Sequence, residues 1–206
     1  MSVNEELSVA HYLNDKDIRT ALLRTLLPDE PETLVIEEFG VGHGAARADI
    51  VVINSHLKAF EIKSDQDNLD RLSHQVHFYN SVFSEVTLVV GYRHAYEALQ
   101  MVPSWWEVKL AGRMPDGSVE IADARGPGCN PSPDASCVAG LLWRGEALNI
   151  LEELDCAAGV RSKPRAAIYQ RLANVIDIDR LNKVVCNHLK NRENWRADLE
   201  PELCDG

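Results

Sequence analysis

Two carboxylates and a lysine, held in two short apolar runs, are the residues of this sequence best suited to chemistry. Asp49 lies in the run Ala48–Ile53. Glu61 and Lys63 lie in the run Leu57–Lys63. Both runs are apolar or β-branched, and an Asn-Ser-His turn separates them, so we predict an antiparallel hairpin.

The register of this hairpin decides whether the carboxylates can act together. A hairpin symmetric about Ser55 places Asp49 opposite Glu61, with Cβ atoms about 4.5–5.5 Å apart, close enough for both to hold one cation. The two-residue period of a strand puts Lys63 on the face of Glu61 and turns Ile62 to the other side. A slip of one residue would destroy this site.

Such a site suits metal-assisted hydrolysis. Asp49, Glu61 and the carbonyl oxygen of Ile62 form a partial octahedron of hard ligands, which Mg²⁺ or Mn²⁺ prefers. Lys63 could then orient or deprotonate a water molecule, or stabilise charge on phosphorus. We therefore expect hydrolysis of a phosphodiester. The simpler alternative is that Asp49 and Lys63 are solvated strand ends and that Glu61 pairs with a lysine, because Glu-x-Lys alone is common.

The segment from Ser64 to Phe83 is predicted to be a helix that leaves directly from the second strand of the hairpin. Ser64, Asp65 or Asp67 could cap it. Its apolar stripe is formed by Leu69, Leu72, Val76, Tyr79 and Phe83. A neighbouring face carries Arg71, Gln75 and Tyr79 at four-residue steps, and Gln75 and Tyr79 could position a phosphate, a water molecule or a base.

With these residues in place, the chain resembles the PD-(D/E)XK nuclease superfamily. Asp49 matches the first acid of that family, Glu61 the second acid and Lys63 the lysine. Gln75 to Tyr79 resembles the Q-x-x-x-Y motif of the RecB-like branch. The resemblance implies an α/β, restriction-endonuclease-like mixed sheet flanked by helices, with an αβββαβ core. It also implies cleavage of DNA, less often RNA, with Mg²⁺.

The match departs from the family pattern at two points. Ala48 stands where many members have a proline. Many members also carry an upstream acid, for which Glu38, Glu37 and Asp17 are the candidates in this chain. We favour Glu38 as a further metal ligand, because the turn at residues 40–44 could bring its strand beside Asp49.

The remaining periodic segments extend this core. Helices are predicted at Asp15–Leu27 and, after a strand at Val86–Val90, at Tyr92–Met101. Two strands, Trp106–Leu110 and Ser118–Ala122, flank a Pro-Asp-Gly turn and are predicted to form a hairpin. A turn-rich linker follows, from Gly126 to Ser136. We predict a nuclease-like core over residues 1–125 and a C-terminal helical region over residues 138–206. Its helices are expected at Leu141–Leu154, Arg165–Val175 and Asp179–Lys190.

Charge and cysteine content bear on partners and location. The net charge is −11, but residues 161–196 hold nine basic and three acidic side chains. This basic segment could be a helix-turn-helix that docks on DNA, or a lid over the core. Five scattered cysteines without a C-x-x-C pair, an acidic start and no long apolar stretch predict a cytoplasmic protein without a membrane span.

Two functions follow as expectations. The first is a Mg²⁺- or Mn²⁺-dependent nuclease acting on nucleic acid, with DNA favoured, of a repair, recombination, restriction or phage-defence type. The second is a nuclease-fold protein that binds nucleic acid or a protein partner without cutting it, since a fold does not establish an activity. A protein partner or a homodimer is compatible with both.

Overall fold

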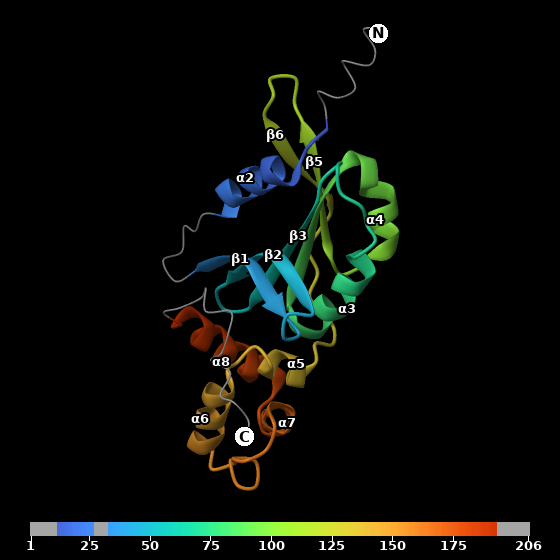
Figure 1. The fold of residues 1–206 in the computed structure, drawn as a ribbon. Helices are drawn as coiled ribbons and strands as arrows, with labels where there is room; N and C mark the ends of the chain where they lie inside the picture. Colours follow the sequence, from blue (N-terminus) through green and yellow to red (C-terminus); the bar gives the residue numbers. More distant parts are fainter. Residues whose placement is uncertain (1–11, 27–32, 193–206) are drawn as a thin grey trace.

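The structure is a computed structural model that describes residues 12–26 and 33–192. Its centre is one six-stranded mixed sheet in which strands that are neighbours in sequence are also neighbours in space (Figure 1). The strands are β1 (Leu34–Val41), β2 (Ala46–Ile53), β3 (Leu57–Lys63), β4 (Glu85–Gly91), β5 (Glu107–Arg113) and β6 (Val119–Arg125).

The direction of each strand follows from the length of its connection. Short turns join β1 to β2, β2 to β3 and β5 to β6, and these three pairs are antiparallel. Helical crossovers join β3 to β4 and β4 to β5, and these two pairs are parallel. Parallel neighbours require such crossovers, because the chain must return to the starting edge.

Helices cover both faces of the sheet (Figure 1). On one face lies α2 (Asp15–Leu26), whose Ile18 and Leu22 pack with Ile50, Phe60 and Ile62. On the other face lie α3 (Leu72–Val82) and, after the short η1 (Tyr92–His94), α4 (Ala95–Met101). We refer to the two apolar layers as the α2 layer and the α3 layer.

Between residue 126 and residue 192, four helices follow the sheet and gather at one end of it, next to β1 and β2 (Figure 1). They are α5 (Ala135–Ala139), α6 (Arg144–Glu153), α7 (Arg165–Val175) and α8 (Ile178–Lys190). Their buried side chains belong to the same apolar cluster as the α3 layer. The segment between β6 and α5 is anchored on α3, because Asn130 donates hydrogen bonds to the carbonyls of Asn80 and Phe83.

Most predicted elements are present, with shifted ends. The Pro-Asp-Gly hairpin is confirmed as β5 and β6, and the three C-terminal helices are confirmed as α6, α7 and α8. The Asp177 side chain caps α8, since it accepts a hydrogen bond from the backbone N–H of Arg180. Helix α5 was not predicted. The first strand runs beyond Glu38, as far as Val41.

The helix predicted from Ser64 was wrong at its start, because α3 begins at Leu72. Residues 64–71 form a looped segment instead. The Asp67 carboxylate accepts from the N–H and hydroxyl of Ser64, and the buried Asp65 accepts from the N–H groups of Leu13 and Arg93. The acidic residues proposed as helix caps therefore fix a loop that joins the sheet to the N-terminal segment.

No helix in residues 12–26 and 33–192 is both long and apolar enough to cross a membrane. The domain boundary near residues 126–136 stays a prediction.

Candidate active site

The hairpin of β2 and β3 has the predicted register. Ile53 pairs with Leu57 and Val51 with Ala59. The ladder ends at the pair of Ile50 and Phe60, and the same register carried one step further sets Asp49 against Glu61. At that step the Asp49 carboxylate accepts from the N–H of Ile62 at 2.7 Å. The side chain thus provides an acceptor just beyond the end of the regular ladder.

The alternation of the β2 side chains between the two faces of the sheet is interrupted at this point. Ala48 and Val51 both lie in the α3 layer, whereas Ile50 between them lies in the α2 layer, so the alternation shifts by one residue at Asp49. On β1, Glu38 has φ 58°, in the left-handed region. Its flanking residues pair across from the two neighbours of Asp49, which places Glu38 opposite Asp49. A left-handed glutamate costs roughly 1–2 kcal/mol, and such strain is concentrated at functional sites.

Glu61 is the centre of the site and is buried, with 1% of its surface exposed. Lys63 Nζ lies 2.5 Å and Gln75 Nε2 2.6 Å from Glu61 Oε1, and both donate to it. The Tyr79 hydroxyl lies 2.6 Å from Oε2 and 2.7 Å from the carbonyl oxygen of Arg47, so its single proton is shared between them. The structure thus brings Lys63, Gln75 and Tyr79 together around Glu61.

The surroundings of Tyr79 hold its ring in place. The ring stacks on that of the buried Trp106 at 5.9 Å and meets Phe83 edge-on at 5.4 Å. Burial, followed by the negative charge of Glu61, raises the pKa of Tyr79 well above its ordinary value. The hydroxyl is therefore a neutral donor that orients Glu61, and Trp106 is a supporting residue that the sequence did not identify as part of the site.

Asp49 has a strongly perturbed acidity. Burial is the largest cause and the charge of Glu61 adds to it, so that the pKa of Asp49 is raised to about 7. The hydrogen bond from Ile62 and the charges of Arg19 and Lys63 oppose this shift. A carboxyl group with such a pKa, next to a second carboxylate, is typical of a functional site.

Arg19, on α2, is a site residue that the sequence did not predict. Its Nη1 donates to the backbone oxygen of Asp49 at 3.0 Å, and its Nη2 lies 3.3 Å from Asp49 Oδ1. Its guanidinium also contacts Asp15, Glu37 and Glu38. Burial alone would lower the pKa of Arg19, but the hydrogen bonds and charges of Asp15, Asp49 and Glu38 outweigh it and raise the pKa.

The three candidates for the upstream acid are now placed. Glu38 is opposite Asp49, with Oε1 3.3 Å from Arg19 Nη2 and Oε2 2.7 Å from Arg47 Nε. Glu37 reaches the same Arg19 guanidinium, at 3.4 Å. Asp17 is instead paired with Arg113 of β5. Of the three, Glu38 and Glu37 share a partner with Asp49, and Asp17 does not.

The donor set can be compared with what a hard cation needs. No group of three or more His, Cys, Asp or Glu side chains in the described ranges is arranged to hold a metal ion. The predicted ligands are the carboxylates of Asp49, Glu61 and Glu38 and the backbone carbonyl of Ile62. These oxygens are the hard donors that Mg²⁺ or Mn²⁺ prefers. Gln75 Oε1 is also buried without a hydrogen-bond partner, beside Glu61.

Other predicted residues lie outside this contact network. Arg71 is the exposed residue that precedes α3, and no side-chain cap is formed there. His74 and His77 pack on the ring of Phe78 at 4.9 and 5.2 Å. The predicted turn between the first two strands is present, but it lies at residues 42–45, because Gly40 and Val41 still belong to β1.

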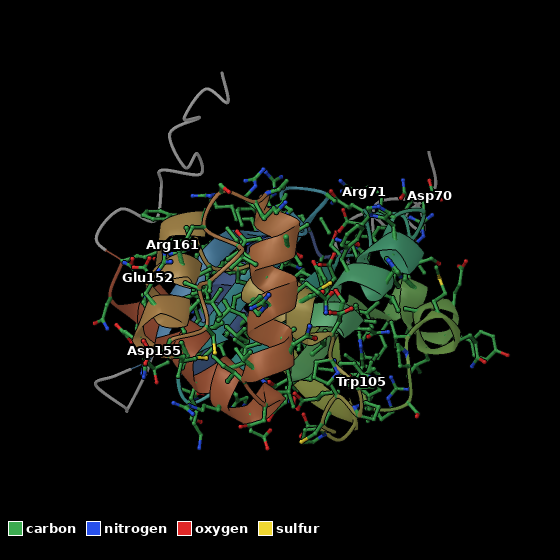
Figure 2. All side chains as sticks on the ribbon, turned by 90° about the horizontal axis from the view of Figure 1, so that it is seen from below. Asp70, Arg71, Trp105, Glu152, Asp155 and Arg161 are labelled. Carbon is green, nitrogen blue, oxygen red and sulfur yellow. The ribbon has the colours of Figure 1, made fainter. Side chains whose placement is uncertain are left out.

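The basic segment lies in α7, α8 and the loop before them, and some of its arginines are engaged within the helical region. Arg161 Nε lies 2.9 Å from Glu152 Oε1, and Arg192 pairs with Glu146. Figure 2 shows Arg161 and Glu152 side by side, on the opposite side of that view from Arg71 at the start of α3. Arg196 lies outside the described residues.

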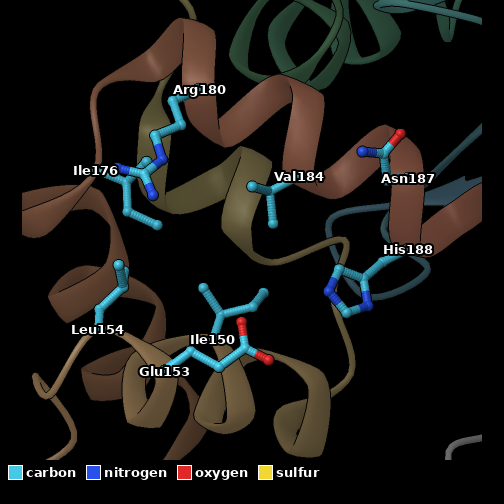
Figure 3. Close-up of a pocket in the computed structure, with 8 residues that line it drawn as sticks. All are labelled: Ile150, Glu153, Leu154, Ile176, Arg180, Val184, Asn187 and His188. Carbon is cyan, nitrogen blue, oxygen red and sulfur yellow. The ribbon is translucent and has the colours of Figure 1, made fainter.

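A separate cavity of about 220 Å³ opens between α6 and α8 (Figure 3). Its floor is apolar and its rim is polar. The lining residues are Ile150, Glu153, Leu154, Ile176, Arg180, Val184, Asn187 and His188. None of them belongs to the network around Glu61, so this cavity is distinct from the candidate active site.

The fold and the site define an α/β protein with a six-stranded mixed sheet, in which one hairpin presents two acids and a lysine. The chain belongs to the bacteriophage P4 protein cII family, because the sequence model of that family matches residues 8–199. It is similar to protein cII of Enterobacteria phage P4, with 34% identity over 98 residues. That stretch covers 47% of this chain and only 37% of the phage protein. No solved structure matches this chain.

Proposed function

We propose that this chain is a metal-dependent nuclease of the PD-(D/E)XK type, acting on DNA. The order α2, β1, β2, β3, α3, β4 reproduces the αβββαβ order of the restriction-endonuclease-like core, and the α2 and α3 layers cover opposite faces of its sheet. We assign the restriction-endonuclease-like arrangement to the chain on this basis.

One observation carries the proposal. Glu61, almost completely buried, accepts hydrogen bonds from Lys63, Gln75 and Tyr79, and it lies beside Asp49 with its raised pKa. These are the five residues that the sequence selected as catalytic. Burial of an ionisable acid is costly unless it is fully hydrogen-bonded or serves a function. Gln75 Oε1, buried beside Glu61 without a hydrogen-bond partner, is one acceptor that the described side chains leave unused.

The proposed roles follow from these contacts. Lys63 holds a positive charge beside Glu61, where it can stabilise charge on a scissile phosphate and orient the attacking water molecule. Gln75, which donates to Glu61, has a free carbonyl oxygen that can accept from that water. Tyr79 fixes the second oxygen of Glu61. In the hydrolysis, the water oxygen forms a bond to phosphorus and gives up a proton to solvent. The bond between phosphorus and the leaving oxygen breaks, and the leaving oxygen takes up a proton from solvent to become a hydroxyl group.

Asp49, Glu61 and the carbonyl of Ile62 would hold Mg²⁺ or Mn²⁺, which would polarise the phosphate and increase the acidity of the attacking water. The affinity for nucleic acid would come from exposed basic residues of the segment 161–196, despite the net charge of −11.

Cleavage assays test this proposal. Plasmid DNA, single-stranded DNA and RNA are incubated at low salt with Mg²⁺ or Mn²⁺, and with EDTA. We expect metal-dependent cleavage of DNA that is lost in Lys63→Ala and in Glu61→Gln. The matched control is Lys16→Ala, which removes an exposed lysine of α2 and should cleave as the parent does. If the parent and Lys63→Ala are equally inert on every substrate, the nuclease proposal is wrong.

A second function is favoured by one observation, namely that Arg19 already engages Asp49. A protein with the same fold could bind nucleic acid without cutting it, with Arg19 as a fixed cation. Affinity for DNA that is unchanged in EDTA, together with no cleavage product, would support this second function.

A further inference from the structure

Four carboxylates contact the guanidinium of Arg19, so that four acidic groups share a single positive charge. Asp15 Oδ1 lies 3.0 Å from Nε, and Glu37 Oε2 lies 3.4 Å from Nη1. Nη2 lies 3.3 Å from both Glu38 Oε1 and Asp49 Oδ1. The side chains of Arg19 and Asp49 are 16% and 20% exposed, so this pair is only weakly screened by solvent, whereas the carboxylates of Asp15, Glu37 and Glu38 are about half exposed.

We propose that Arg19 takes the place of a second divalent cation, so that the active site holds a single metal ion, between Asp49 and Glu61. This inference rests on the nuclease function proposed above. It assigns to Arg19 a positioning role: the residue fixes Asp49 and Glu38 and determines how many metal ions the site accepts.

The geometry supports a single metal ion. In two-metal sites the cations are about 3.5–4 Å apart and share a carboxylate. The second position here would lie between Asp49 and Glu38, which are opposite each other on β2 and β1. Nη2 of Arg19 bridges these two carboxylates, so a cation cannot enter between them while Arg19 remains. On the other side of Asp49, Glu61 accepts hydrogen bonds from a lysine, a glutamine and a tyrosine. Arg19 is not among these partners of Glu61, so it does not occupy the position between Asp49 and Glu61.

The backbone of β1 is adapted to the same arrangement. In a regular strand, Glu37 and Glu38 would point to opposite faces of the sheet. The left-handed conformation of Glu38 interrupts this alternation, and both side chains reach Arg19. Glu38 thereby contacts both Arg19 and Arg47. In this inference it helps to hold Arg19, and it is not a ligand of the single metal ion.

The test is the number of Mn²⁺ ions bound by the full chain, measured by electron paramagnetic resonance of free Mn²⁺ and by calorimetry. We expect the parent protein to bind one ion. Arg19→Gln should bind two, because four carboxylates are left without their cation. Arg24→Gln, which changes an exposed arginine of the same helix, is the matched control and should bind one. Thermal unfolding gives a second readout: Mn²⁺ should raise the midpoint of Arg19→Gln more than that of the parent.

Each outcome separates this inference from the proposed function. A parent that binds no Mn²⁺ overturns the proposed metal site itself. A parent that binds two ions, or an Arg19→Gln protein that binds one, overturns only the role of Arg19. An Arg19→Gln protein that does not fold even with Mn²⁺ also overturns it, because the metal then cannot replace the guanidinium. Arg19→Lys keeps a cation in place and should bind one ion, and two would contradict the inference.

Discussion

At the scale of single residues, the raised pKa of Asp49 makes the stability of the folded protein depend on pH. Its pKa is about 7 in the folded protein and near 4 in the unfolded chain. Because the folded pKa is the higher one, the folded state holds the proton more tightly. The contribution of Asp49 to stability is therefore complete below about pH 4 and is lost as the pH rises through about 7. The total effect is up to about 4 kcal/mol.

Asp49→Asn isolates this contribution. We expect the free energy of unfolding of the parent, relative to that of Asp49→Asn, to fall between about pH 4 and about pH 7 in EDTA. Urea denaturation at several pH values measures it. Mn²⁺ should reduce the slope, because a bound cation favours the ionised carboxylate. Parallel curves for parent and variant in EDTA would show that Asp49 ionises normally.

Tyr79 allows a test of the network around Glu61. Tyr79→Phe keeps the ring stacked on Trp106 but removes the donor to Glu61, so we expect a loss of about 1–3 kcal/mol in the free energy of unfolding. The matched control is Tyr169→Phe, because the Tyr169 hydroxyl is also a buried donor, but to the neutral carbonyl of Leu142. A charged acceptor is the more costly one to leave unpaired. Equal losses in the two variants would contradict a special contribution of the hydrogen bond from Tyr79 to Glu61.

The sequence predicted the residues of the site that lie on one hairpin and its following helix, and it missed Arg19. The first group could be predicted because strand register and helix period relate residues that are close in sequence. The contact of Arg19 with Asp49 joins α2 to β2 across 30 residues. It depends on how α2 lies on the sheet, which periodicity alone does not determine.

At the scale of elements, the β1–β2 turn connects the hairpin to α3. Gly42 and Gly44 both have positive φ, 61° and 87°, which is unfavourable for other residues. A Cβ on Gly42 would lie 2.6 Å from the Phe78 ring, whereas a Cβ on Gly44 would meet nothing within 4 Å. Phe78 is next to Tyr79, so displacement of its ring would disturb the helix that holds Glu61.

This difference gives a paired prediction. Gly44→Ala should cost about 1–2 kcal/mol in the free energy of unfolding, from backbone strain alone. Gly42→Ala should cost about 1–3 kcal/mol more, because the Phe78 ring must also move. Urea denaturation compares the two variants with the parent. A Gly42→Ala protein as stable as Gly44→Ala would mean that the turn moves away from α3 without cost.

Element boundaries show a second limit of sequence-based prediction. The acidic residues before α3 have the composition of a helix start, yet Asp65 bonds to backbone groups of Leu13 and Arg93. These partners lie 52 and 28 residues away in sequence. Close packing continues at Gly91, where a Cβ would lie 2.3 Å from the Asp65 carboxylate. Long-range contacts of this kind override local preferences.

At the scale of the whole molecule, the distribution of charge is the feature that relates the helical region to nucleic acid. The arginines of the basic segment are not equivalent. Arg192 is 9% exposed, binds Glu146 through two nitrogens and lies 4.6 Å above the Trp143 ring. Lys163, Arg180 and Lys183 are exposed. Arg192 therefore supports the fold, whereas only the exposed basic side chains can neutralise phosphates.

Two variants separate these roles. The triple change Lys163→Ala, Arg180→Ala, Lys183→Ala should weaken DNA binding and leave the free energy of unfolding nearly unchanged. It should also reduce the slope of log affinity against log salt concentration, by about 0.9 for each phosphate that is no longer neutralised. Arg192→Ala should leave that slope unchanged but lower the free energy of unfolding by about 3 kcal/mol, because Glu146 then loses its partner. Fluorescence anisotropy with a labelled duplex over a range of salt concentrations, together with urea denaturation, measures both. If the triple variant retains the full salt slope, the surface that binds DNA lies elsewhere on the chain, and the helical region then serves to support β1 and β2, against which it packs.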